Sequence, residues 1–177
     1  MTYNTSLLNK RTESIKQKRL IGHIKRGSGG PTLVFFGGIH GNEPSGVSAL
    51  SQVFKTLESR KDEFELNGEI FALSGNLTAL KEGVRFVDRD LNRLWIPTEL
   101  DRIFDSEEGD LKNEENEAKE IYHLLREILL NSSPPFYFID YHTTSADTIP
   151  FITINDAYIN RKIASLFPAP VILVIEE

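Results

Sequence analysis

Two histidines and a glutamate are the residues of this sequence best suited to bind a metal ion. His40 and Glu43 lie three residues apart in the glycine-rich segment GGIHGNEPSG, and His142 lies in the segment FIDYHTTS. Two imidazoles and one carboxylate leave a position of a tetrahedral zinc ion open, as in catalytic rather than structural zinc sites. These three residues therefore form a candidate zinc site that could activate water.

Each of these residues also has an interpretation without a metal. Glu43 could be a favourable carboxylate in the first turn of a helix, and His142 could be a hydrogen-bonded histidine of the core. The other histidines, His23 and His123, have no candidate partner nearby in the sequence, and we expect structural or surface roles for them. The metal site is favoured because its members follow separate predicted strands.

A second group of chemically suited residues lies in the segment GVRFVDRDLNRLW, residues 83–95. Arg85 and Arg93 can each donate two parallel hydrogen bonds to a carboxylate, and Asn92 can add a directed hydrogen bond. These side chains could therefore hold a substrate carboxylate. The alternative is an exposed network of ion pairs that contributes little to stability. Its members would be Asp88, Arg89, Asp90 and Arg93.

The elements that must position these residues alternate between strands and helices. Apolar runs typical of buried strands predict strands at residues 19–24, 32–36, 68–73, 136–139, 151–154 and 171–175. Apolar residues at helical spacing predict helices at residues 47–57, 114–130 and 156–166, with a short helical turn at 77–82 and a loop at 98–113. This order predicts an α/β fold with a mixed, largely parallel sheet and helices on both faces.

Such a sheet would bring the candidate residues together. In open α/β sheets the ligand crevice lies at the carboxyl ends of the strands. The segments with His40 and His142 each follow a predicted strand directly. We therefore expect them to converge at one edge of the sheet.

Composition narrows the chemistry further. The chain has 177 residues, which fits one domain, and contains no cysteine, so metal ligands must be His, Asp or Glu. A net charge of -6 argues against nucleic acid as a partner. No apolar stretch approaches the ~18 residues of a membrane span, and no signal peptide precedes residue 19, which predicts a cytoplasmic protein. Residues 1–18 are interpreted as a polar leader.

Three segments together resemble a known family. GGIHGNEPSG, RFVDRDLNRLW and DYHTTS are similar, in the same order, to the N-terminal signature segments of the aspartoacylase and succinylglutamate desuccinylase family, whose fold is zinc carboxypeptidase-like. The resemblance extends from about residue 33 to residue 177. It implies a zinc-dependent amidohydrolase that deacylates a small N-acyl amino acid. It also implies one zinc ion per chain, held by His40, Glu43 and His142.

The resemblance also implies roles for the charged segment. Arg85 would stabilise an oxyanion or hold the acyl carbonyl, while Asn92 and Arg93 would hold a substrate carboxylate. Asp90 would orient the ring of His40 as a carboxylate behind the metal ligand. Asp140 is an alternative for such a role, because residues two apart on a strand share a face and Asp140 precedes His142 by two.

In one respect the sequence departs from the family pattern. The family's general base is a glutamate on a later strand, followed by a β-rich C-terminal domain, and no such glutamate is identified here. Glu176 and Glu177 are acidic but do not match its position. Residues 19–177 are therefore expected to form a catalytic domain without the β-rich part.

Two alternative functions stay open. The DLNR run suggests a carboxypeptidase-like peptide hydrolase, and the missing base suggests a catalytically incomplete metal- or carboxylate-binding domain.

Overall fold

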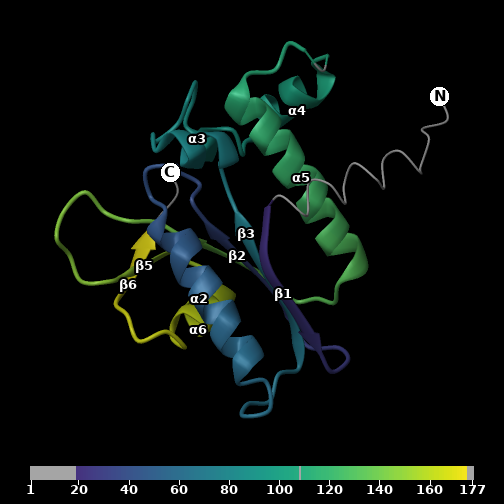
Figure 1. Ribbon diagram of the computed structural model, residues 1–177, viewed down its shortest axis with the longest axis vertical. Helices are drawn as coiled ribbons and strands as arrows, with labels where there is room; N and C mark the ends of the chain where they lie inside the picture. Colours follow the sequence, from purple (N-terminus) through teal and green to yellow (C-terminus); the bar gives the residue numbers. More distant parts are fainter. Residues whose placement is uncertain (1–18, 108, 175–177) are drawn as a thin grey trace. The chain divides into compact units, whose positions relative to one another are not determined.

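The computed structural model describes residues 19–107 and 109–174, and the predicted leader at residues 1–18 lies outside them. The described chain divides into two compact units, with the boundary between Thr143 and Thr144. The elements of the first unit follow the chain in Figure 1. They are β1 (Leu20–Arg26), β2 (Thr32–Gly37), α2 (Ser45–Ser59), β3 (Gly68–Ser74), α3 (Leu77–Glu82), the 3-10 helix η1 (Leu91–Arg93), α4 (Pro97–Asp105), α5 (Asn113–Asn131) and β4 (Phe136–Tyr141).

The first unit contains a four-stranded sheet in the order β1-β3-β2-β4. β2 runs parallel to both β3 and β4, whereas β1 runs antiparallel to β3 at the edge. The predicted mixed, largely parallel sheet is therefore confirmed. Because β2, β3 and β4 run in one direction, their carboxyl ends lie at the same edge of the sheet.

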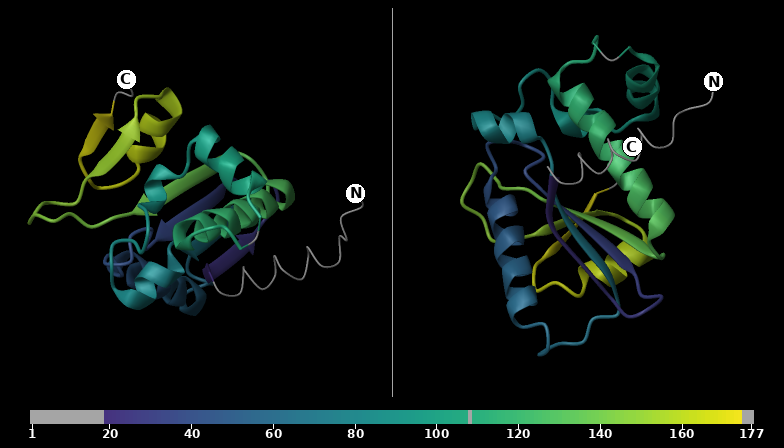
Figure 2. Two further views of the ribbon diagram at one scale, coloured as in Figure 1. Left: turned by 90° about the horizontal axis from the view of Figure 1, so that it is seen from above. Right: turned by 45° about the vertical axis from the view of Figure 1, so that its right-hand side comes forward.

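Helices cover both faces of this sheet (Figure 2), as predicted. Side chains along a strand alternate between faces, so neighbouring residues enter different cores. Val34 and Phe36 of β2 pack in a core with Ile121 and Leu124 of α5. Phe35, between them, packs in a core with residues of α2 on the opposite face. The alternation fixes which side of β2 each helix covers.

The second unit is a strand-helix-strand segment. It consists of β5 (Ile152–Asn155), α6 (Tyr158–Ala164) and β6 (Val171–Val174). β5 and β6 are parallel to each other and form their own two-stranded sheet. Three of the predicted elements are therefore present, but among the described residues they do not extend the sheet of the first unit.

One predicted loop is wrong. The predicted loop at residues 98–113 overlaps α4, Pro97–Asp105, and a shorter connection leads from this helix to α5. Pro97 at the first helical position has the φ angle that a helix start requires, and Ile103 is fully buried. The segment is rich in acidic residues and buries one apolar side chain, so its sequence lacks the apolar periodicity by which a helix is predicted.

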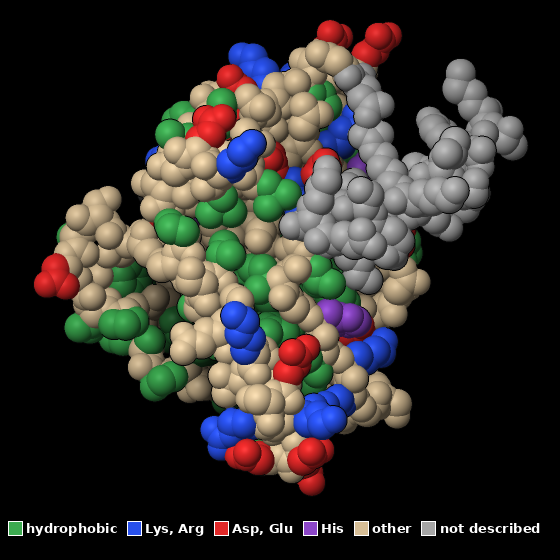
Figure 3. Space-filling model, viewed as in Figure 1, with side chains coloured by type: hydrophobic (Ala, Val, Ile, Leu, Met, Phe, Trp, Pro, Cys, Tyr) green, Lys and Arg blue, Asp and Glu red, His purple; other side chains and the backbone are tan. Residues whose placement is uncertain are grey.

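Figure 3 shows acidic and basic side chains interspersed on the drawn face, so the charge of its described residues is mixed.

None of the helices in the described part of the chain is long and apolar enough to cross a membrane.

Candidate metal centre

Two neighbouring parallel strands bring His40 and His142 together. β2 ends at Gly37 and β4 at Tyr141, and these two residues are direct partners in the parallel register. His40 lies in the loop after β2, and His142 follows β4 immediately. Glu43 reaches the same place from the turn that precedes α2. The edge of the sheet thus assembles residues that are separated by about a hundred positions in sequence.

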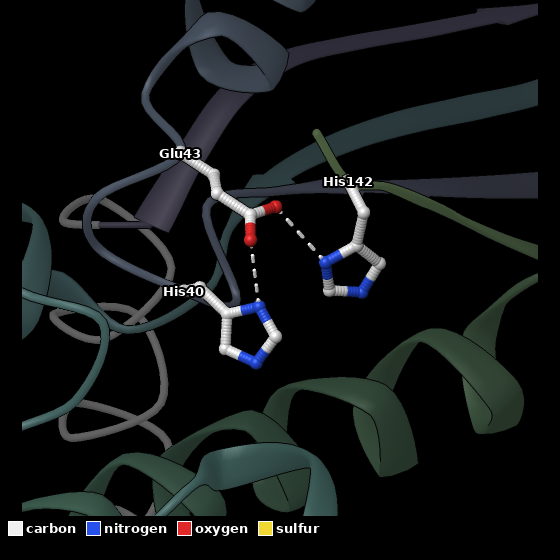
Figure 4. A group of neighbouring side chains, drawn as sticks. All are labelled: His40, Glu43 and His142. Atoms are coloured by element: carbon white, nitrogen blue, oxygen red, sulfur yellow. Dashed lines mark hydrogen bonds and ion pairs between the residues drawn. The ribbon is translucent and has the colours of Figure 1, made fainter. Parts of the chain in front are cut away.

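The carboxylate of Glu43 lies between the two imidazole rings (Figure 4). Nδ1 of His40 is 3.0 Å from Oε1 of Glu43, and Nδ1 of His142 is 3.1 Å from Oε2. One potential ligand atom from each residue lies within 4.8 Å of the others. His40 and Glu43 are buried, whereas His142 is exposed, so the cluster is open to solvent beside His142.

A further carboxylate lies against the second nitrogen of each ring. Nε2 of His40 is 3.1 Å from Oδ1 of Asp90, and Nε2 of His142 is 2.7 Å from Oδ2 of Asp140. A carboxylate in this position makes Nε2 the donor and leaves the lone pair of Nδ1 for a metal ion. Asp90 and Asp140, which the sequence presented as rivals, therefore each hold a different histidine.

The arrangement of these groups fits a cation. With Nε2 as donor, Nδ1 of each neutral ring presents a lone pair to a carboxylate oxygen of Glu43 at 3.0 and 3.1 Å. Two lone pairs at that separation repel each other unless a proton or a metal ion lies between them. Two imidazoles and one carboxylate are a donor set of catalytic zinc sites. The residues of the cluster are therefore suited to hold zinc.

The electrostatics keep the glutamate ionised. Burial alone would raise the pKa of Glu43, but the Thr143 N–H, 2.8 Å from Oε2, and the two imidazoles hold that pKa below its ordinary value. The carboxylate of Asp140 raises the pKa of His142. In the absence of a metal, a proton on His142 would thus be stabilised by carboxylates at both of its nitrogens.

Arg85 and Asn92 lie beside this cluster, as the sequence suggested for the charged segment. The guanidinium of Arg85 is half exposed and donates to Oδ2 of Asp90 at 3.2 Å, and its Nη1 is 3.7 Å from Oε1 of Glu43. Nδ2 of Asn92 lies 3.4 Å from Nε2 of His142. These contacts bring two of the three predicted substrate-binding residues to the candidate metal site.

Arg93 is placed differently. Its side chain is exposed, and within residues 19–107 and 109–174 its guanidinium forms no ion pair. The predicted alternative, a surface network of the neighbouring charges, does not form among these residues, because Arg89 pairs with Glu99 and Asp90 faces His40. The backbone N–H of Arg93 donates to the carbonyl of Asp90 at 2.9 Å, while its guanidinium has no ion pair with the clustered residues.

Gly41 brings the metal loop against α3. Its N–H donates to the carbonyl of Arg85 at 3.2 Å. A Cβ atom at this position would lie 2.0 Å from the carbonyl carbon of Ala79 and 2.4 Å from the nitrogen of Leu80. Only glycine permits so close an approach of two backbones. The loop is therefore packed directly on the helix that follows β3.

The remaining histidines lie outside the cluster. Nε2 of His23 is 2.7 Å from Oε1 of Glu69 on the neighbouring strand, and the His23 ring stacks on Phe71 at 4.3 Å. The ring of His123 meets the ring of Phe104 edge-on at 5.7 Å. The contacts of His23 come from the neighbouring strand, whereas the ring of His123 also meets that of Tyr122, its neighbour in the chain, at 6.1 Å.

The buried glutamates of α5 were not recognised as part of the site's surroundings. An acidic first turn suits the helix dipole, yet here Glu114 is buried and accepts hydrogen bonds from the loop at residues 87–89, and Glu117 is buried and accepts from the first turn of α3. A signal was present, because both continue the stripe of Ile121 and Leu124 at helical spacing. Glu176 and Glu177, considered as the general base, lie outside the described residues.

Comparison with known proteins identifies relatives. The family described as the succinylglutamate desuccinylase/aspartoacylase catalytic domain matches residues 29–173. A probable aspartoacylase from Acaryochloris marina is 31% identical over 134 residues, which cover 75% of this chain and 42% of that protein. A succinylglutamate desuccinylase from Pseudomonas paraeruginosa is 36% identical over 66 residues, 37% of this chain and 19% of that protein.

Solved structures show the same fold. The succinylglutamate desuccinylase of Chromobacterium violaceum aligns with a TM-score of 0.51 and 22% identity over 72% of this chain and 36% of that one. The enzyme of Vibrio parahaemolyticus aligns with a TM-score of 0.50 and 20% identity over 72% of this chain and 33% of that one. The fold is therefore zinc carboxypeptidase-like, and the chain spans less than half the length of these relatives. On the match over residues 29–173, the chain belongs to the succinylglutamate desuccinylase and aspartoacylase family.

Proposed function

We propose that this chain provides the zinc site and part of the substrate site of a hydrolase that removes the acyl group from an N-acyl amino acid. The observation that carries the proposal is the cluster of His40, Glu43 and His142, in which both Nδ1 atoms face one carboxylate. Membership of a family of deacylating enzymes supports the same reaction. The products would be a carboxylate and a free amino acid.

The three clustered residues would hold one zinc ion through Nδ1 of each histidine and an oxygen of Glu43. Zinc bound there would supply a Lewis acid that polarises the amide carbonyl and makes water more acidic. Asp90 and Asp140 keep the proton of each imidazole on Nε2, so that both Nδ1 lone pairs remain available. These two carboxylates thus set the tautomer and the orientation of the rings.

The charged segment supplies groups for the substrate. Arg85, half exposed and 3.7 Å from Glu43, is suited to donate hydrogen bonds to the oxygen of the acyl carbonyl as negative charge develops there. Arg93 and Asn92 would bind a carboxylate of the amino acid. The guanidinium of Arg93, which has no ion pair within the described residues, could form a bidentate contact with a ligand.

The test is zinc-dependent hydrolysis by the purified protein. Metal is removed with a chelator, zinc is titrated back, and amine release is measured on a panel of N-acyl amino acids that includes succinylglutamate. We expect release that rises with zinc up to one equivalent and is abolished in His142→Ala. His123→Ala, which removes a histidine outside the cluster, is the matched control and should retain activity.

Three other outcomes contradict this proposal. Release of C-terminal residues from peptides, without release from N-acyl amino acids, would identify a carboxypeptidase. Stoichiometric zinc binding without turnover of either class would identify a metal-binding domain that is catalytically incomplete. Equal activity of His142→Ala and the wild type would show that the cluster is not the active site.

A further inference from the structure

Glu114 is a fully buried carboxylate that accepts hydrogen bonds from the backbone of one loop and from the side chain of Asn76. Oε1 accepts from Nδ2 of Asn76 at 3.0 Å and from the N–H of Val87 at 2.6 Å. Oε2 accepts from the N–H groups of Asp88 at 2.9 Å and Arg89 at 3.1 Å. The relative exposure of Glu114 is 0%. A buried carboxylate is costly unless its oxygens are satisfied, and here each oxygen has two donors.

These bonds favour the ionised form of the side chain. Burial alone would raise the pKa of Glu114, but the N–H groups of the loop and the amide of Asn76 hold that pKa below its ordinary value. Hydrogen bonds to a charged acceptor are stronger than bonds between neutral groups. The backbone N–H groups of residues 87–89 therefore bind α5 through hydrogen bonds to a charged acceptor, which are stronger than bonds to a neutral carbonyl.

The attached loop leads directly into the candidate metal centre. Residues 87–89 are followed by Asp90, whose Oδ1 lies 3.1 Å from Nε2 of His40. They are preceded, two positions before Val87, by Arg85, whose guanidinium donates to Asp90. Anchoring three consecutive N–H groups fixes the chain on both sides of the anchor. The placement of Asp90 against His40 thus depends on the position of α5.

Other contacts of the same loop are weaker anchors. Asp88 accepts from the N–H and the amide of Asn113 at 3.1 and 2.9 Å, and Arg89 pairs with Glu99 at 2.9 Å. Asp88 is exposed, and Arg89 and Glu99 are partly exposed, and solvent weakens such pairs. Arg89 also lies 3.7 Å from the buried Glu115 of α5, but its own guanidinium is 39% exposed, whereas Glu114 is fully buried.

We infer that Glu114 is a positioning residue, which holds the loop at residues 87–89 so that Asp90 orients His40 for the metal ion. Glu114 contacts neither the metal ligands nor the residues assigned to the substrate, and it acts through the backbone. The inference concerns the zinc site and rests on the proposed function only for the identity of the ion.

Glu114→Gln tests the inference with little change in shape. Each oxygen of Glu114 accepts from two donors, so an amide NH₂ in either position would face two N–H groups and lose both hydrogen bonds. The matched control is Glu69→Gln. Glu69 is also buried, with 6% exposure, but it contacts His23 and Lys25 at the amino-terminal end of β3.

The first measurement is amide hydrogen exchange of the metal-free protein, residue by residue. In Glu114→Gln we expect the amides of residues 87–89 to exchange about tenfold faster or more, relative to the slowest core amides of the same variant. In Glu69→Gln these amides should keep the wild-type rate. Wild-type rates at residues 87–89 in Glu114→Gln would overturn the anchor.

The second measurement is zinc affinity by competition with a chromophoric chelator. Glu114→Gln should bind zinc roughly 10- to 100-fold more weakly, as expected when the group behind a metal ligand is displaced. Glu69→Gln should bind as the wild type does. Faster exchange of residues 87–89 with unchanged zinc affinity would overturn the positioning role.

A second variant keeps the test decisive if Glu114→Gln does not fold. Glu114→Asp retains the charge but withdraws the carboxylate by one carbon atom, and it should show both effects to a smaller extent. Neither measurement uses a substrate. Absence of amine release by the wild type would therefore refute the proposed function, while exchange rates and zinc affinity would still decide the role of Glu114.

Discussion

Asp90 joins three parts of the candidate site through a single carboxylate. Oδ1 accepts from the backbone N–H of Asn92 at 3.0 Å, which caps the 3-10 helix η1, and also lies 3.1 Å from Nε2 of His40. Oδ2 accepts from Arg85. Burial would raise the pKa of Asp90, but these three partners hold it below its ordinary value. The side chain is therefore an ionised acceptor for a ring, a backbone and a guanidinium.

Replacing Asp90 should weaken the metal site without removing a ligand. In Asp90→Ala, Nε2 of His40 loses its acceptor, and we expect zinc affinity to fall roughly 10- to 100-fold. Chelator competition measures the change. Asp88→Ala is the control, because it leaves the backbone N–H of residue 88 in place and removes only a carboxylate that accepts from Asn113 at the start of α5; its zinc affinity should stay near the wild-type value. Equal losses in both variants would contradict a specific role of Asp90.

Arg93 should affect substrate binding and not metal binding. If its guanidinium binds a substrate carboxylate, Arg93→Ala should raise KM at least tenfold and leave the zinc content at one per chain. Arg93→Lys keeps the charge but lacks the two parallel donors, so it should recover only part of the loss. Steady-state kinetics and metal analysis of the same preparations check this. Loss of zinc in Arg93→Ala would contradict the assignment.

The residue types of the cluster could be predicted from sequence, but their surroundings could be predicted only in part. His40, Glu43 and His142 have few roles open to them in glycine-rich or polar segments that follow strands. Glu114 had a common alternative role, that of an exposed first-turn carboxylate. Glu114 differs from such a carboxylate because the loop at residues 87–89 buries it. The path of that loop depends on tertiary packing, which the sequence alone does not predict.

At the scale of elements, α4 and α5 differ in how plainly the sequence indicates them. α5 has a long apolar stripe and was predicted to within one residue at each end. α4 is nine residues long and buries only Ile103. Arg102 and Glu99 form a partly exposed ion pair, Phe104 meets the ring of Tyr122 on α5, and most of the helix is polar in composition. A short helix that makes so little core contact has almost no periodic signal.

The buried glutamates predict the response of the fold to acid. The folded-state pKa values of Glu114 and Glu69 lie below the ordinary value of 4.5. Their contribution to stability is therefore fully present above pH 4.5 and is lost as the pH falls through the folded-state pKa values. Urea unfolding from about pH 7 to about pH 3 should show this decline.

The matching variants test which groups cause the decline. Glu114→Gln and Glu69→Gln should each be less stable than the wild type at neutral pH. Each should also lose less stability on acidification, because one carboxylate no longer takes up a proton on unfolding. A slope with pH that is unchanged in both variants would assign the acid sensitivity to other groups.

For the whole molecule, the sequence indicated the element order better than the sheet partners. Alternating strands and helices predict parallel pairing but do not specify which strands pair. β2, β3 and β4 share one sheet, whereas β5 and β6 pair with each other in a separate unit. Apolar runs such as Val171–Val174 are compatible with either arrangement.

The two units should respond differently to zinc. All three candidate ligands precede Thr144, so a bound ion stabilises the first unit. At a free zinc concentration of about 100 times Kd, the free energy of unfolding should rise by about 2.7 kcal/mol. Hydrogen exchange with and without zinc should therefore show added protection at residues 19–143 and little at 144–174. Equal added protection in both ranges would contradict a site confined to the first unit.

The contact between Gly41 and α3 has a consequence for protein engineering. A library that randomises the metal loop to change its ion preference would include position 41 by default. There, however, even a methyl group would lie about 2 Å from the backbone of Ala79. Nearly all members with another residue at 41 would be lost to misfolding before selection for a new ion began. Such a library should therefore randomise the exposed positions around His142 and keep Gly41 unchanged.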